Sequence, residues 1–123
     1  MARVLIVEDE APIRANLMRF VRLEGHEAFE AADGREGLQV ARDERPDLIL
    51  CDVTMPHAGG LEVLAGLRND AALALIPFVF LSASAEAERL EEALQLGANA
   101  YLTKPFNLAQ LKAVLQTYLP ANR

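Results

Sequence analysis

The sequence has few cysteines and no long hydrophobic run. Its single cysteine, Cys51, excludes an internal disulfide and fits a reducing compartment. No apolar run approaches the roughly 20 residues that a membrane-spanning helix needs, and residues 1–7 lack the layout of a signal peptide. We therefore expect a soluble, cytoplasmic protein without a membrane partner.

Positive charge is also scarce. The 12 Lys and Arg residues against 18 Asp and Glu give a net charge of -6, whereas proteins that bind nucleic acids usually gather basic residues on one face. We therefore expect no direct nucleic-acid binding. Lys104 and Lys112 are the only lysines, so composition does not readily explain a lysine among functional residues.

The length and the apolar content predict one compact domain over residues 1–123. About half of the residues, 52%, are hydrophobic, which is enough to bury a core without disulfides or metal staples. Short strand-like runs alternate with longer helical patterns throughout. Three runs are apolar without alternation, as in strands covered on both faces, and two mixed runs suit sheet edges. The first three are residues 4–7, 48–51 and 78–81, and the two edge strands are residues 26–30 and 98–102.

The segments between these strands carry the start and stop signals of helices. Asp33 with Glu36, and Asn107 with Gln110, have the spacing of a capping box at a helix N-terminus. A fourth helix is expected from the cap residue Ser84 to Gly97. The residues expected to face inward are Ile13, Leu17, Phe20, Val21, Leu38, Ala41, Leu61, Leu64, Leu67, Leu90, Leu94, Leu108, Leu111, Leu115 and Leu119.

This alternation predicts an α/β fold of the (βα)5 type. Right-handed crossovers and helices on both faces favour the flavodoxin-like, doubly wound parallel sheet with strand order 2-1-3-4-5. In that order the chain reverses its winding direction between the first and third strands. A ligand site is therefore expected beyond the carboxyl ends of those strands.

Polar residues follow the strands at that edge of the sheet. The carboxylates of Glu8, Asp9 and Asp52 would repel one another by roughly 4 kcal/mol per pair at about 4 Å and an effective dielectric constant near 20. A bound divalent cation would offset this repulsion. Hard oxygen ligands and a phosphoryl substrate suit Mg²⁺, and carboxylates also serve as nucleophiles. The residues concerned are Glu8 and Asp9 after the first strand, Asp52 after the third, Ser82 after the fourth and Lys104 after the fifth.

Taken in order, these residues resemble the response-regulator receiver domains of two-component signal transduction, which include the chemotaxis regulators. The resemblance covers essentially the whole chain. Each feature is weak by itself, but their order and their positions at strand ends make the combination specific. The features are Glu8-Asp9, Asp52-Val53-Thr54-Met55-Pro56 with Gly60 beyond, Ser82-Ala83, and Lys104-Pro105-Phe106 after Tyr101.

The resemblance implies a phosphoprotein that acts in a phosphorelay. Asp52 would accept a phosphoryl group from a phosphohistidine on a sensor histidine kinase or phosphotransfer protein. Asp9 and Asp52 would bind Mg²⁺ directly, Glu8 through water, and the backbone carbonyl of Thr54 would be a further ligand. The domain would catalyse only its own phosphorylation and dephosphorylation, so it is not expected to be an enzyme.

The same resemblance implies a switch. Lys104 and Ser82 would contact phosphoryl oxygens, and the Lys104-Pro105 bond is expected to be cis. Movement of Ser82 would let Tyr101 rotate inward and change the face made by the fourth helix, fifth strand and fifth helix. That face would control binding to a downstream protein target or output domain, or a phosphorylation-dependent homodimer.

Several residues also have a purely structural interpretation. Glu8 and Asp9 could be acids that favour a helix entry, Tyr101 could serve only for packing, and Lys104 could be a solvated loop charge. Cys51 should point away from its neighbour Asp52 by strand alternation and belong to the core.

Other functions fit the sequence less well. A haloacid dehalogenase-type aspartyl-phosphate hydrolase needs Asp-x-Asp-x-Thr after the first strand, whereas Asp9 is followed by Glu10, Ala11, Pro12 and Ile13. In a flavodoxin-type carrier, the run Glu8-Asp9-Glu10 would repel the FMN phosphate. A pseudo-receiver, which has the fold without phosphorylation, stays open as an alternative. So does the choice between a stand-alone receiver and the amino-terminal piece of a longer protein.

Overall fold

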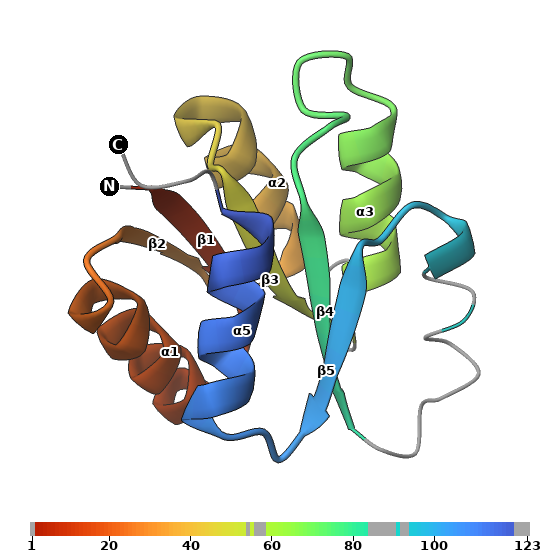
Figure 1. The fold of residues 1–123 in the computed structure, drawn as a ribbon. Coiled ribbons are helices and arrows are strands. Elements are labelled where there is room, and N and C mark those ends of the chain that lie inside the picture. Colours follow the sequence, from red (N-terminus) through yellow and green to blue (C-terminus); the bar gives the residue numbers. More distant parts are fainter. Residues whose placement is uncertain (1, 54, 56–58, 84–90, 92–93, 120–123) are drawn as a thin grey trace.

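A single sheet of five parallel strands organises the chain (Figure 1). The computed structural model describes residues 2–53, 55, 59–83, 91 and 94–119. The strands are β1 (Arg3–Val7), β2 (Glu27–Ala31), β3 (Leu48–Asp52), β4 (Phe78–Ala83) and β5 (Ala100–Lys104). The helices are α1 (Ala11–Leu23), α2 (Gly34–Glu44), α3 (Gly60–Arg68) and α5 (Leu108–Tyr118).

The strand order β2-β1-β3-β4-β5 confirms the predicted doubly wound sheet. All four strand pairings are parallel. Most of the expected fourth helix, including Ser84 and Leu90, lies outside the described residues. Among the described helices, none is both long and apolar enough to span a membrane.

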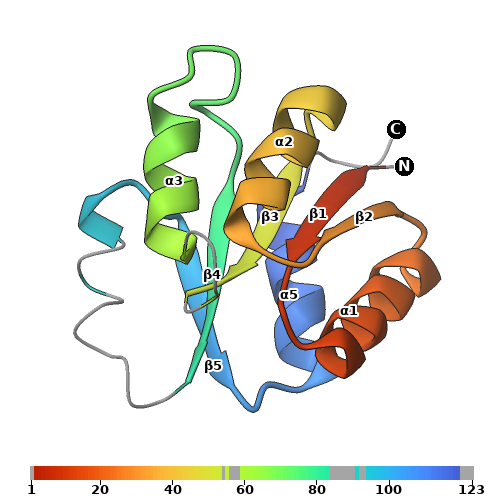
Figure 2. The same cartoon turned by 180° about the vertical axis from the view of Figure 1, so that it is seen from behind.

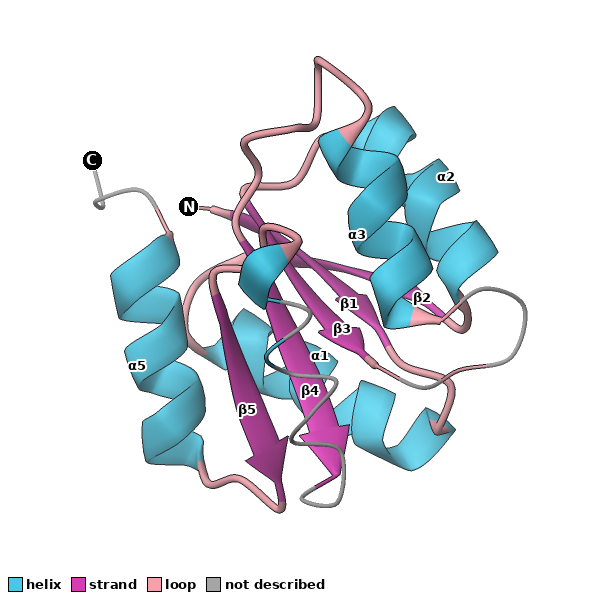
Figure 3. Cartoon of the chain, turned by 90° about the vertical axis from the view of Figure 1, so that its right-hand side faces the viewer, coloured by secondary structure: helices cyan, strands magenta, loops and turns pink. Residues whose placement is uncertain are grey.

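Helices cover both faces of the sheet. Figure 1 has α1 and α5 in front of the strands, and the reverse view in Figure 2 has α2 and α3 in front. Figure 3, a view turned by 90° from Figure 1, shows the sheet between α5 on one side and α2 and α3 on the other. Successive strand residues therefore enter different cores. Val4 and Ile6 pack with α1 and α5, whereas Leu5 and Val7 pack with α2 and α3, which explains why these strands are apolar without alternation.

Side-chain caps mark the N-termini of α2 and α5. Asn107 and Gln110 form the predicted capping box, in which each side chain accepts a hydrogen bond from the other's backbone N–H at 2.8 Å. The box expected at Asp33 is only half formed. Asp33 accepts from the Glu36 N–H at 2.8 Å, but the Glu36 carboxylate accepts from the N–H of Ala32 instead of that of Asp33.

The strand boundaries differ from the predicted ones. β5 begins two residues later than expected and ends at Lys104, β2 begins one residue later, and β4 continues through Ala83. The reason is backbone pairing: the ladder joins Ser82 with Thr103 and Ala83 with Lys104, beyond the end of the apolar run. Hydrophobic patterns do not report such pairing.

The expectation of an inward-facing side chain is wrong for two leucines. Leu108 is 64% exposed and Leu94 is 41% exposed. Leu108 is the first residue of α5 and lines an open surface cavity instead of the core. The rest of its stripe behaves as expected, since Leu111 and Leu115 are buried.

Candidate functional site

Strand alternation places two acids and a lysine on the same side of the sheet. Glu8, Asp52 and Lys104 each stand two residues beyond a strand residue that packs toward α1 and α5. Because side chains along a strand alternate between faces, the three side chains lie on one face at the carboxyl ends of β1, β3 and β5. The strand residues two positions before Glu8, Asp52 and Lys104 are Ile6, Leu50 and Leu102.

The three carboxylates predicted from the sequence lie together. Glu8, Asp9 and Asp52 each offer a carboxylate oxygen within 4.8 Å of the others. They differ sharply in exposure, because Glu8 is fully buried, Asp52 is 7% exposed and Asp9 is open to solvent. This arrangement concentrates negative charge in a partly dehydrated position, which a hard divalent cation such as Mg²⁺ would fit.

Lys104 bridges two of these acids. Its Nζ lies 3.0 Å from Oε1 of Glu8 and 3.4 Å from Oδ2 of Asp52. Burial lowers the pKa of Lys104, but the hydrogen bond to Glu8 and the charge of Asp52 outweigh it, so the pKa lies above its ordinary value. The ammonium is therefore charged at neutral pH and offsets part of the acidic charge.

The buried carboxyl group of Glu8 has a raised pKa. Its pKa is raised from 4.5 to about 7. Burial is the largest cause and the charge of Asp52 adds to it, whereas the hydrogen bonds from Lys104 and the backbone of Glu10 act in the opposite direction. The Glu10 N–H donates to Oε2 of Glu8 at 3.2 Å. The single positive charge of Lys104 does not neutralise the three carboxyl groups, which agrees with a site that binds a cation.

A glycine permits the close approach of α3 to this edge. A Cβ at Gly60 would lie 2.6 Å from the Phe80 ring and closer still to the backbone oxygen of Asp52. The Gly60 N–H donates to the backbone oxygen of Val53 at 2.8 Å. Gly60, which the sequence motif includes, therefore holds Val53, the residue after Asp52, against the start of α3.

Ser82 on β4 and Tyr101 on β5 lie on the face of the sheet opposite to that of Glu8, Asp52 and Lys104. Phe78 and Phe80 pack with α2 and α3, and Ser82 continues that row. Tyr101 pairs with Phe80 and Ser82 with Thr103, so Ser82 and Tyr101 are diagonal neighbours on one face. Ser82 is fully buried, whereas Tyr101 is 43% exposed.

The remaining predicted features are partly described. The Lys104-Pro105 bond is cis, as expected. Cys51 is buried in the core with α2 and α3, also as expected. Thr54, the expected carbonyl ligand, lies outside the described residues.

Sequence reasoning missed Arg14. Its Nη1 donates to the backbone oxygen of Glu8 at 2.8 Å, and its Nε donates to Oε1 of Glu30 at 3.0 Å. An arginine on an amphipathic helix has no local sequence signal for these hydrogen bonds, because its partners come from the end of β1 and from β2.

Comparisons with known proteins agree with this geometry. Residues 4–116 match the family model of the response regulator receiver domain. Sporulation initiation phosphotransferase F of Bacillus subtilis is 33% identical over 118 residues, which cover 96% of this chain and 94% of that protein. The phosphate regulon transcriptional regulatory protein PhoB of Pseudomonas aeruginosa is 37% identical over 123 residues, which cover 97% of this chain and 54% of that protein. The chain thus spans about half the length of several curated relatives that it matches.

Solved structures show the same fold. Chemotaxis protein CheY4 of Vibrio cholerae superposes with a TM-score of 0.90 at 36% identity, over 97% of this chain and 99% of that one. The receiver domain of a sensor histidine kinase from Pseudomonas aeruginosa, described with a magnesium ion coordinated in its active-site cleft, has a TM-score of 0.87 at 31% identity, over 95% of this chain and 96% of that one. From the fold, the acidic edge and these matches, we conclude that the chain belongs to the family of response regulator receiver domains.

Proposed function

We propose that this receiver domain accepts a phosphoryl group on Asp52, from a phosphohistidine of a histidine kinase or phosphotransfer protein, in a Mg²⁺-dependent reaction. The observation that carries the proposal is the placement of Asp52 within reach of two further acids and of the Lys104 ammonium. A related protein named as a phosphotransferase, and a magnesium ion in the cleft of a related receiver, support it.

The chemistry requires an ionised nucleophile that is held in position. A carboxylate oxygen of Asp52 would attack phosphorus as the bond between phosphorus and the imidazole nitrogen breaks. The bonding electron pair would return to the imidazole, and an aspartyl phosphate would form. Lys104, 3.4 Å from Asp52 Oδ2, is close enough to pair with a phosphoryl oxygen there.

Glu8, Asp9 and Asp52 are the side chains that would hold Mg²⁺, and we extend the set to the backbone carbonyl of Thr54. When bound, Mg²⁺ would neutralise charge on the carboxylates and on the transferred phosphoryl group. The Glu8 carboxyl group must be ionised to contribute negative charge to the Mg²⁺ site. Since its pKa is about 7, cation binding at neutral pH would displace a proton from part of the population.

We also propose that Ser82 and Tyr101 form the switch. Their diagonal placement on adjacent strands supports direct coupling, because a shift of the Ser82 hydroxyl toward the phosphoryl group alters the space beside Tyr101. In this proposal, the 43% exposed position of Tyr101 would be the outward state. An inward rotation would change the surface of β5 and α5 that faces a protein target, an output domain or a second copy.

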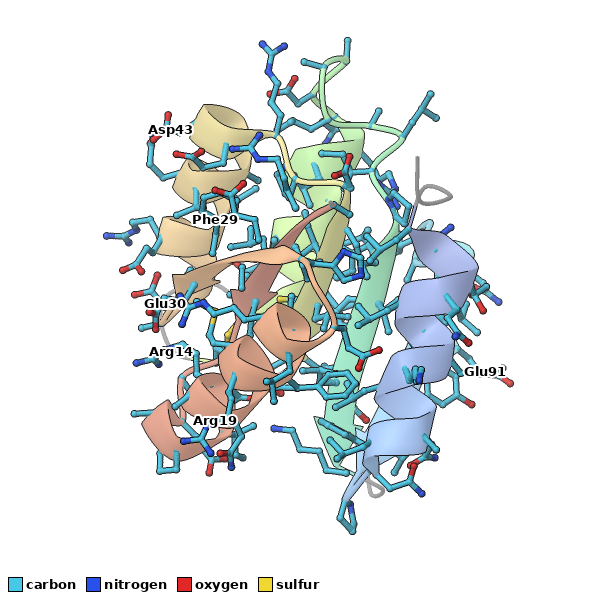
Figure 4. All side chains as sticks on the ribbon, turned by 60° about the vertical axis from the view of Figure 1, so that its left-hand side comes forward. Arg14, Arg19, Phe29, Glu30, Asp43 and Glu91 are labelled. Atoms are coloured by element: carbon cyan, nitrogen blue, oxygen red, sulfur yellow. The ribbon has the colours of Figure 1, made fainter. Side chains whose placement is uncertain are left out.

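The acceptor is tested with acetyl phosphate as the phosphoryl donor and intact mass as the readout. The unmodified chain should gain one phosphoryl group with Mg²⁺ and none with a chelator. Asp52→Asn should gain none, whereas Asp43→Asn, an exposed position on α2 (Figure 4), should behave as the unmodified chain. An adduct that persists in Asp52→Asn would refute the acceptor, and no adduct in any chain would favour the pseudo-receiver.

The switch is tested by the fluorescence of Tyr101. The chain has two tyrosines and no tryptophan, so Tyr118→Phe leaves Tyr101 as the only strong fluorophore. Adding beryllofluoride, a phosphoryl mimic, together with Mg²⁺ should change its emission and reduce its quenching by iodide. The same additions should have no effect in the combined Tyr118→Phe and Asp52→Asn variant. An unchanged accessibility of Tyr101 in the Tyr118→Phe variant, which keeps Asp52, would contradict the switch.

A further inference from the structure

The Arg14 side chain joins three elements beside the acidic site. Its guanidinium donates to the Glu8 backbone oxygen at 2.8 Å and to the Glu30 carboxylate at 3.0 Å. Figure 4 labels Arg14 on α1 and Glu30 on β2, on the same side of the molecule. The Arg14 side chain is 19% exposed and that of Glu30 is 54% exposed. The contact with Glu8 is thus the more sheltered end of this clamp.

The clamp restricts the backbone from which Asp9 projects. The Glu8 oxygen belongs to the peptide that joins Glu8 to Asp9, and the Glu8 N–H donates to the backbone oxygen of Ala31 at 3.0 Å. Both backbone groups of Glu8 are therefore bonded to neighbouring elements. Asp9 itself is exposed, so the packing around its side chain contributes little to its position and the direction of the backbone matters more.

We propose that Arg14 is a positioning residue that orients Asp9 for binding Mg²⁺. This inference rests on the metal site of the proposed function. Arg14 does not have to touch the ion, because it holds the peptide that carries a ligand. Groups that orient metal ligands in this way typically contribute about 10- to 100-fold to metal affinity.

Charge repulsion alone predicts the opposite effect of removing Arg14 on Mg²⁺ affinity. A guanidinium beside the site repels an incoming cation. If charge were its only effect, removing Arg14 would strengthen Mg²⁺ binding. If Arg14 positions Asp9, removing it weakens Mg²⁺ binding despite the loss of a positive charge.

The test is a Mg²⁺ titration of the whole chain without any phosphoryl donor. Affinity is measured by calorimetry and by the amide NMR shifts of Asp9 and Glu10, for the unmodified chain, Arg14→Met and Arg19→Met. Arg19 is exposed on the same helix, so Arg19→Met makes the same change in net charge. We expect Arg14→Met to bind Mg²⁺ about tenfold more weakly and Arg19→Met to bind it as the unmodified chain does or slightly more tightly.

Each result has a defined meaning. Equal or tighter Mg²⁺ binding by Arg14→Met, with normal binding by the unmodified chain, overturns the positioning role and leaves the proposed function intact. Absence of Mg²⁺ binding by the unmodified chain overturns both. Should Arg14→Met fail to fold, Arg14→Lys replaces it. That variant keeps the charge, but one ammonium cannot reproduce the forked contact, so it should also bind Mg²⁺ several-fold more weakly, and unchanged affinity would overturn the inference.

Discussion

Replacing Glu8 with glutamine should remove a specific pH dependence of stability. The Glu8 side chain is fully buried and accepts hydrogen bonds from Lys104 and from the Glu10 N–H. Glutamine has nearly the same shape but does not ionise, and it offers one acceptor oxygen instead of two. We expect the lost hydrogen bond to cost about 1 kcal/mol of unfolding free energy at low pH.

The magnitude follows from the pKa of Glu8. Burial, the largest cause, raises that pKa from 4.5 to about 7 in the folded chain. The folded state then binds more protons than the unfolded state over this window, so stability falls as pH rises from 4.5 through 7. At about 1.4 kcal/mol per pH unit, the full window corresponds to about 3 kcal/mol. This contribution is present below the unfolded pKa and is lost above the folded one.

Equilibrium unfolding in guanidinium chloride measures the effect. Far-UV circular dichroism is the suitable probe because the chain has no tryptophan, and a chelator keeps divalent cations away. Between about pH 5 and pH 8, the stability of the unmodified chain relative to Glu8→Gln should fall by about 3 kcal/mol. A difference that stays constant across this range would refute the buried, raised-pKa account of Glu8.

Four further results are expected. Gly60→Ala should lower the unfolding free energy by about 1–3 kcal/mol, because its Cβ would collide with the backbone oxygen of Asp52; an unchanged denaturation midpoint would contradict this. Asn107→Ala should cost about 1 kcal/mol through loss of the α5 cap, measured in the same way, and a loss near zero would argue against the cap. Leu75→Ser should change stability by less than about 0.5 kcal/mol, since Leu75 is 95% exposed. Mg²⁺ binding at about pH 7 should release about half a proton from Glu8, detected by calorimetry in two buffers of different ionisation enthalpy, and no release would contradict its role in the metal site.

The strand arrangement of the sheet and the residue types at its acidic edge could be predicted from the sequence. Apolar runs such as residues 48–51 predicted central strands, because only strands covered on both faces lack alternation. In a doubly wound sheet the carboxyl ends of parallel strands share one edge, so the order of the elements alone was enough to place Glu8, Asp52 and Lys104 together. The cap at Asn107 was equally local, since its partner is three residues away.

Features that depend on contacts between distant segments could not be predicted from local sequence patterns. Pairing with β4 set the ends of β5 and carried Lys104 into the strand. Burial raised the pKa of Glu8, because desolvation depends on which elements close over a side chain. The contact of Arg14 with Glu8 and Glu30 likewise requires α1, β1 and β2 to be packed together. Periodicity and capping are properties of neighbouring residues, whereas strand register, dehydration and such clamps exist only once the chain has folded.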